Sequence, residues 1–170
     1  QQLEPVYLIT GSDLPKIAIA LRRLRARFAE GSVEHLFAES ASGEEAVAAT
    51  NALGLFGGGE RLVVVEGIER WKKGDAEAVV GYLESPTAGS VLALVGDASR
   101  VAGLESACAA AGSVLRYDVN KRRVGRREVD DFPSWVRGQF ERAGLQADPE
   151  TAERLVELAG QDALALQNEV

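Results

Sequence analysis

The chain has 170 residues, of which 46% are hydrophobic, and its formal net charge is −7. This length allows one substantial core with a small further domain, and no window approaches the roughly 18 uninterrupted apolar residues of a membrane span. The negative charge excludes a protein whose whole surface binds nucleic acid, because phosphate binding needs clustered Lys and Arg side chains. No secretory signal pattern opens the chain, so we expect a cytoplasmic protein without a membrane partner.

The N-terminal third of the chain predicts two strands, each followed by a helix. Residues 7–10 and 33–38 are the apolar runs of the two strands, the second being the weaker candidate. Asp13 is placed to cap the first helix, which carries apolar residues at helical spacing over 17–28. A capping box at 42–45 opens the second helix.

The middle of the chain continues this alternation. Strands are predicted at residues 61–66, 91–95 and 114–117, and helices at 75–83 and 99–111. Continuous β-branched runs are typical of strands covered on both faces. The alternation implies right-handed βαβ units, and hence an α/β fold with a mostly parallel five-stranded sheet and helices on both faces.

The pattern changes after Asp118. The segment 120–127 is basic, has no apolar period and gives no strand signal, so we expect a boundary between an α/β domain at 1–119 and a small all-helical domain at 120–170. The helices predicted there cover residues 133–143, 149–159 and a stretch that starts near Asp162. Because the chain begins without Met and ends inside an apparent helix, we expect it to be a fragment of a longer protein.

A phosphate-binding loop would follow the first strand of such a sheet, but the residues depart from its pattern. The pattern G-x-x-x-x-G-K-[ST] supplies backbone N–H groups, a lysine for the outer phosphates and a hydroxyl for Mg²⁺. Here Pro15 stands before Lys16 and Ile17 follows it. An acidic pair should follow the third strand, yet Glu66 precedes Gly67 and reads as a strand-end carboxylate facing solvent. We therefore predict a degenerate nucleotide site without ATP hydrolysis.

Other candidate chemical groups are sparse. The glycine triple 57–59 leads into a strand instead of a helix, so it lacks the aligned N–H groups of a phosphate cradle. His35 is the only histidine and reads as a half-buried residue, and Cys108 reads as a small buried residue in an Ala-rich helix. The sequence predicts no catalytic set, no metal site and no cofactor.

Two large apolar residues, Leu55 and Phe56, lie among glycines between the second helix and the third strand. Such a loop has high backbone entropy and no regular element to cover its side chains. One interpretation is an exposed anchor for a partner's pocket, as in interface hot spots. The other is that both side chains pack back onto the core.

The segments 7–13, 55–57 and 60–66, together with Trp135 and Val136, resemble the delta subunit of the bacterial DNA polymerase III clamp loader. The resemblance spans nearly the whole chain. It implies an AAA+-like (P-loop-NTPase-like) domain that has lost its nucleotide site, followed by part of a helical lid domain. A C-terminal collar domain of that family would be absent from this chain.

The resemblance also implies a function in DNA replication. The clamp-binding residues would be Leu55 and Phe56, with Leu53 as a further contact, inserted into a pocket of the sliding clamp to help open the ring. The implied partners are the sliding clamp (beta subunit), the gamma/tau and delta prime subunits, and primed DNA within the assembled complex. The chain would be a non-catalytic component of a DNA-directed DNA polymerase holoenzyme.

Alternatives remain for the basic stretch and for the function. The cations at Lys121, Arg122, Arg123, Arg126 and Arg127 form either a solvated linker or intersubunit surface, or a contact that helps hold DNA. A small-molecule enzyme on the same sheet would place polar groups at strand ends, where Asp13 and Asp97 are the candidates. A nucleotide-binding switch with an unorthodox loop is the other rival.

Overall fold

The computed structural model describes residues 3–52, 60–99, 101–161, 163 and 166. Its strands and helices in chain order are β1 (Val6–Thr10), α1 (Leu14–Arg25), β2 (Val33–Phe37), α2 (Gly43–Asn51), β3 (Arg61–Glu66), the 3-10 turn η1 (Ile68–Arg70), α3 (Lys73–Leu83), β4 (Ser90–Val95), α4 (Leu104–Ala111), β5 (Ser113–Arg116), β6 (Lys121–Val124), β7 (Arg127–Asp130), α5 (Phe132–Arg142) and α6 (Pro149–Ala159). Within the described ranges, no helix is long and apolar enough to cross a bilayer.

The chain divides into two compact units. The first comprises Gln1–Thr10 and Ala20–Arg116, and the second comprises Gly11–Ile19 and Tyr117–Val170. The boundary between residues 119 and 120 that the sequence suggests stays a prediction.

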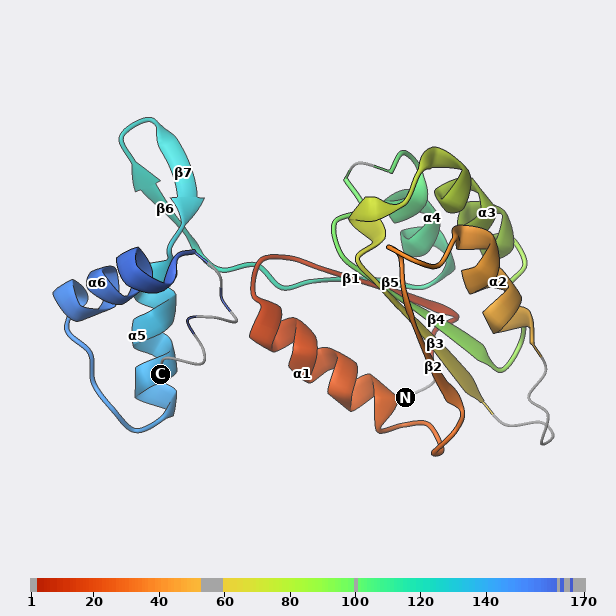
Figure 1. The fold of residues 1–170 in the computed structure, drawn as a ribbon, viewed down its shortest axis with the longest axis horizontal. Coiled ribbons are helices and arrows are strands. Elements are labelled where there is room, and N and C mark those ends of the chain that lie inside the picture. Colours follow the sequence, from red (N-terminus) through yellow and green to blue (C-terminus); the bar gives the residue numbers. More distant parts are fainter. Residues whose placement is uncertain (1–2, 53–59, 100, 162, 164–165, 167–170) are drawn as a thin grey trace. The chain divides into compact units, whose positions relative to one another are not determined.

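The first unit contains the five-stranded parallel sheet that the sequence predicts (Figure 1). Its strand order is β2-β3-β4-β1-β5, so the N-terminal strand lies inside the sheet between β4 and β5. Val6 pairs with Leu92, and Leu8 pairs with both Leu94 and Val114. Parallel neighbours require crossover connections, and the helices between successive strands supply them.

One face of the sheet packs against α2, α3 and α4, which lie together on that side in Figure 1. Alternate strand residues, among them Leu8, Val63 and Leu94, point into this layer and are buried. The helices contribute small or branched side chains to this layer, such as Ala46 of α2 and Val79 of α3, which are fully buried. Every second residue of each strand therefore packs against the apolar face of a helix.

The other face carries the intervening strand residues, such as Leu62 and Val64, which are also fully buried. The C-terminal end of α1 reaches this face, because an Arg25 guanidinium nitrogen lies 3.3 Å from His35 Nδ1 of β2 and 3.7 Å from Glu66 Oε1 of β3. The prediction of helices on both faces is confirmed. Because β3 and β4 are covered on both faces, their sequences are continuous apolar runs without polar alternation.

Asp75 joins the starts of α2 and α3. Its Oδ1 accepts the Gly43 N–H at 3.0 Å, and its Oδ2 accepts the Lys72 N–H at 2.9 Å. A Cβ at Gly43 would collide with the Asp75 carbonyl, so only glycine allows this approach. Ser42 and Glu45 form the predicted capping box at the start of α2.

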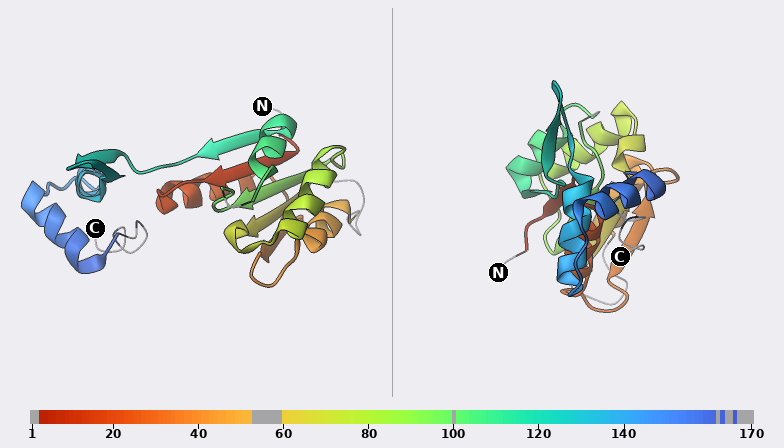
Figure 2. Two further views of the ribbon diagram at one scale, coloured as in Figure 1. Left: turned by 90° about the horizontal axis from the view of Figure 1, so that it is seen from above. Right: turned by 90° about the vertical axis from the view of Figure 1, so that its left-hand side faces the viewer.

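The second unit corrects the expectation of an all-helical domain. The basic segment that gave no strand signal forms an antiparallel hairpin, β6 and β7, in which Arg122 pairs with Val129 and Val124 pairs with Arg127 (Figures 1 and 2). A two-stranded ribbon exposed on both faces needs no apolar alternation, and for that reason the hydrophobic pattern missed it.

A separate small core holds the second unit together. It is built by Val119, Trp135, Val136, Ala152 and Leu166, with Phe132 edge-on to Trp135 at 6.4 Å between ring centroids. Helices α5 and α6 lie where the sequence predicts them, each with an aspartate cap and proline in its first turn. Of the third predicted helix, Asp162 lies outside the described residues, while Ala163 and Leu166 are buried.

Candidate functional site

The turn after β1 takes the position where a phosphate-binding loop would lie. Gly11 has a φ of +129°, and a Cβ there would collide with the Tyr117 carbonyl, so the turn requires glycine. The Asp13 N–H donates to the same carbonyl at 2.9 Å. Asp13 caps α1 as predicted, because its Oδ1 accepts the Lys16 N–H at 3.2 Å.

The Asp13 side chain is fully buried and saturated with donors from its own unit. Its Oδ2 accepts the indole Nε1–H of Trp135 at 3.0 Å and lies 2.7 Å from the Lys16 ammonium nitrogen. A carboxylate therefore occupies the helix N-terminus, which would otherwise attract a phosphate. The lysine that would meet phosphates neutralises this carboxylate instead.

Ser12 ties the same turn to the chain that precedes the hairpin. Its hydroxyl oxygen accepts the Val119 N–H at 3.0 Å. Together with the bond from Trp135, this contact fixes the turn from two directions. The turn is thus bonded to other protein groups through Ser12 and Asp13.

The second nucleotide element is also occupied by protein. Glu66 at the end of β3 was expected to face solvent, but it is only 35% exposed and its Oε1 lies 2.9 Å from His35 Nε2. The Arg25 guanidinium can only donate to Nδ1 of His35, so Nε2 carries the proton that bonds to Glu66. Glu66 therefore accepts a hydrogen bond from His35 and forms an ion pair with Arg25, and Gly67 follows it where a second acid would stand.

The candidate clamp-binding residues Leu53, Leu55 and Phe56 lie outside the described residues, as does the glycine triple. The described residues that flank this segment, at the end of α2 and at the start of β3, are both hydrogen-bonded to residues 87–90. Ser90 Oγ donates to the Thr50 carbonyl at 2.7 Å, and Thr87 Oγ1 donates to Asn51 Oδ1 at 2.6 Å.

The flank on the β3 side is held by the same stretch. The Arg61 N–H donates to the Gly89 carbonyl at 2.8 Å. The end of α2 and the start of β3 are therefore both anchored to residues 87–90. The described residues on both sides of the segment 53–59 are therefore held in place.

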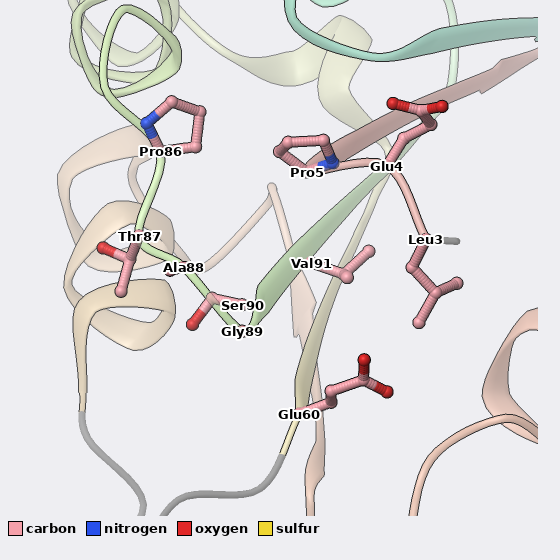
Figure 3. Close-up of a pocket in the computed structure, with 10 residues that line it drawn as sticks. All are labelled: Leu3, Glu4, Pro5, Glu60, Pro86, Thr87, Ala88, Gly89, Ser90 and Val91. Atoms are coloured by element: carbon pink, nitrogen blue, oxygen red, sulfur yellow. The ribbon is translucent and has the colours of Figure 1, made fainter.

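A pocket of about 310 Å³ lies at this amino-terminal edge of the sheet (Figure 3). It is lined by the segments 3–5 and 86–91 and by Glu60. Among the described residues that line it, Glu4 and Glu60 are the only carboxylates, and there is no histidine, cysteine or cation. This lining supports apolar and hydrogen-bonded contacts with a partner and supplies no acid–base pair with distinct environments.

The two candidate aspartates of the enzyme alternative belong to different units. Asp13 belongs to the second unit and Asp97 to the first, and Asp13 is occupied by Trp135 and Lys16. Cys108 is fully buried, and burial, with a smaller contribution from Glu105, raises the pKa of its thiol from 9.0 to about 12. Within the described part of the chain, no group of three or more His, Cys, Asp or Glu side chains could hold a metal.

Sequence reasoning missed the role of Trp135 as the partner of Asp13. The two residues are separated by 122 positions, so no local pattern connects them. The available signal was chemical: a buried indole N–H needs an acceptor, and a cap aspartate has a second oxygen to offer.

Comparison with protein-family models finds no match, and comparison with curated proteins finds none either. Solved structures do match. The DNA clamp loader delta protein of Bacillus subtilis is similar with a TM-score of 0.62 and 16% identity, over 98% of this chain and 52% of that one. A DNA polymerase III gamma subunit-related protein of Thermotoga maritima is similar with a TM-score of 0.55 and 19% identity, over 99% and 54%.

A variant of RuvB from Thermotoga maritima is also similar, with a TM-score of 0.50 and 15% identity over 98% of this chain and 52% of that one. The chain thus spans about half the length of the structures it matches. At these identities the likeness concerns the fold. The chain has an α/β fold of the AAA+ type, similar to that of clamp-loader subunits.

Proposed function

We propose that this chain is a non-catalytic clamp-loader subunit, similar to delta, that binds a sliding clamp and helps open the ring for loading on primed DNA. The observation that carries the proposal is a clamp-loader-like fold whose phosphate-binding turn is filled by the buried Asp13 carboxylate. A fold of this type without a usable phosphate site is suited to transmit force and to bind partners. Other subunits would hydrolyse ATP.

Clamp contact would come from Leu55 and Phe56, with Leu53 beside them. The anchoring of both flanks of this segment to residues 87–90 supports this assignment, because preorganised residues lose less entropy when a partner binds beside them. Burial of each side chain would contribute about 1.5 to 3 kcal/mol, and the same energy would favour an open clamp over a closed one.

The other proposed partners are further clamp-loader subunits of the gamma/tau and delta prime kind. The rival enzyme hypothesis loses its principal residue, because the Asp13 carboxylate already accepts from Trp135 and Lys16 and is fully buried. A substrate would have to displace these donors to reach it.

The test is calorimetric titration of this chain with the sliding clamp of its own organism, beside the variant Leu55→Ala/Phe56→Ala. We expect the double substitution to weaken binding by at least about 3 kcal/mol, which corresponds to more than about a hundredfold. The reason is that both apolar anchors are truncated.

A matched control is Phe37→Ala/Leu158→Ala, which removes one exposed phenylalanine and one exposed leucine elsewhere, and it should bind like the original chain. Circular dichroism checks that all three proteins are folded. Equal binding by the two variants would refute the assignment of the site, and no binding by the folded original chain would refute clamp binding itself.

A further inference from the structure

The β6–β7 hairpin is an exposed arm whose base is fixed in the core of its own unit. Every residue from 121 to 128 is exposed. Val119 before the hairpin and Phe132 after it are both buried in the second core, and the Asp131 N–H donates to the Asn120 carbonyl at 2.6 Å to close the base. Figure 1 shows the ribbon extending beyond α5 and α6. The ribbon therefore buries little of its own surface, yet its root is held.

The turn of the hairpin is built for a tight ribbon. Two residues, Gly125 and Arg126, connect the paired Val124 and Arg127. Gly125 has a φ of +61°, whereas no described non-glycine residue has a positive φ, which is the pattern of a type II′ turn. Such a turn matches the strand twist and presents the Arg126 side chain at the tip.

Charge on the arm opposes the charge of the chain. Five of the seven residues at 121–127 are Lys or Arg, whereas the chain as a whole has a net charge of −7. Arg122 lies 3.6 Å from an Asp131 oxygen. No ion pair engages Arg123, Arg126 or Arg127 among the described residues. The free cations thus gather at the distal end of the ribbon.

The strand register separates two faces of the arm. Lys121 stands opposite Asp130 and Arg123 opposite Glu128 on one face, so cations and carboxylates alternate there. The other face carries Arg122 and Arg127 with two valines, and β6 and β7 add no carboxylate to it. One face and the tip are therefore cationic, and Val124 between them is half exposed.

We propose that this arm binds the phosphate backbone of duplex DNA. Four of its five cations are arginines, whose planar guanidinium groups bind phosphate oxygens in pairs. A two-stranded ribbon also has the width that the major groove of DNA admits. The rest of the chain has a net negative charge, which favours contact through the arm. The inference rests on the proposed function for the choice of duplex DNA as the polyanion.

The test is fluorescence anisotropy of a labelled duplex of about 20 base pairs with this chain, titrated over a series of salt concentrations. The variant Arg126→Ala/Arg127→Ala should weaken binding roughly tenfold at low salt, and the slope of log K against log salt should become shallower by about 2. The charge-conserving variant Arg126→Lys/Arg127→Lys should keep the original slope.

The matched control is Lys72→Ala/Lys73→Ala, which removes two exposed cations from the start of α3 and should bind DNA like the original chain. Equal DNA binding by the original chain and the Arg126→Ala/Arg127→Ala variant would overturn the proposal. Polyglutamate that binds the arm more tightly than DNA would overturn it too, and would assign the arm to an acidic protein surface.

The same proteins are titrated with the sliding clamp. Clamp binding without DNA binding would refute the role of the arm and leave the proposed function standing. DNA binding through the arm without clamp binding would refute the proposed function alone.

Discussion

At the scale of single residues, Asp13 shows how a nucleotide site can be replaced by protein. A fully buried carboxylate is costly unless donors compensate it, and here three donors do so: the Lys16 N–H, the Lys16 ammonium and the Trp135 indole. The carboxylate thus takes the place that the anionic oxygens of a phosphate would have at a helix N-terminus. The turn is consequently held in one conformation without a ligand.

The indole bond makes a measurable contribution to stability. The substitution Trp135→Phe keeps an aromatic ring in the core but removes one donor from a buried carboxylate, so we expect the free energy of unfolding to fall by about 1 to 3 kcal/mol. Urea denaturation followed by circular dichroism measures this change. The control Tyr7→Phe removes an exposed acceptor for the Glu4 N–H and should cost little. Equal losses from both substitutions would contradict the role of Asp13.

The sequence predicted one half of this arrangement and missed the other. Asp13 as a helix cap is a local pattern, because the carboxylate and the N–H it accepts are three residues apart. Trp135 reaches the same carboxylate from 122 residues away, and its apolar character predicted only burial. For Glu66, too, the strand end was evident while its bond to His35 was not.

At the scale of elements, the starts of α2 and α3 are connected by the side chain of Asp75. Asp75 accepts N–H groups from the starts of two helices, each of which would lack a partner without it. Ser42 and Glu45 satisfy neighbouring groups at the start of α2.

The pKa of Glu45 lies below its usual value of 4.5, mainly because the Ser42 N–H donates a hydrogen bond to the Glu45 carboxylate. Its stabilising contribution is thus present above pH 4.5 and is lost as the pH falls.

Removing the shared acceptor should cost more than removing an ordinary cap. For Asp75→Ala we expect a loss of about 2 kcal/mol in the free energy of unfolding, against about 1 kcal/mol for Ser42→Ala. The exposed Glu77→Ala, which breaks only a surface pair with Lys73, serves as the control and should be near neutral. Urea unfolding of the three variants tests the order, and an Asp75→Ala protein as stable as Glu77→Ala would refute the shared joint.

Strands and helices with a buried apolar face could be predicted from the sequence, whereas the exposed β6–β7 hairpin could not. β3 lies at the predicted residues because a β-branched run covered on both faces has few alternatives. The β6–β7 ribbon has no buried face and left only Gly125 and its two-residue turn as a signal. Helix α4 begins at Leu104, later than predicted, after Gly103 in a left-handed conformation.

At the scale of the whole molecule, both segments that correspond in sequence order to nucleotide-binding elements are bonded to other protein groups. Asp13 occupies the first, and Glu66 is bonded to His35 at the second. The alternation of strands and helices predicted the five-stranded parallel sheet, the family resemblance implied that the fold is AAA+-like, and both predictions are confirmed. The proposed clamp contact, in contrast, depends on the resemblance of a short segment, because glycines and two apolar residues do not determine a conformation by themselves.

We expect the whole chain to show no response to nucleotide. A ligand at 100 times its dissociation constant would add about 2.7 kcal/mol to the folded state and raise the melting temperature by several degrees. Thermal unfolding with and without Mg²⁺-ATP should therefore give the same melting temperature, because the Asp13 carboxylate already occupies the N-terminus of α1. A rise that saturates with ATP, and is absent with Mg²⁺ alone, would contradict this prediction and support the nucleotide-switch alternative.

The interior place of β1 in the sheet has a consequence for synthesis of the chain. β1 is synthesised before β4 and β5, the two strands with which it pairs, and these strands begin at Ser90 and Ser113. Its backbone groups and apolar side chains must wait until most of the first unit has been made, which is the situation that slows folding and exposes chains to aggregation. The segment Val6–Thr10 is thus where a chaperone would be needed during translation.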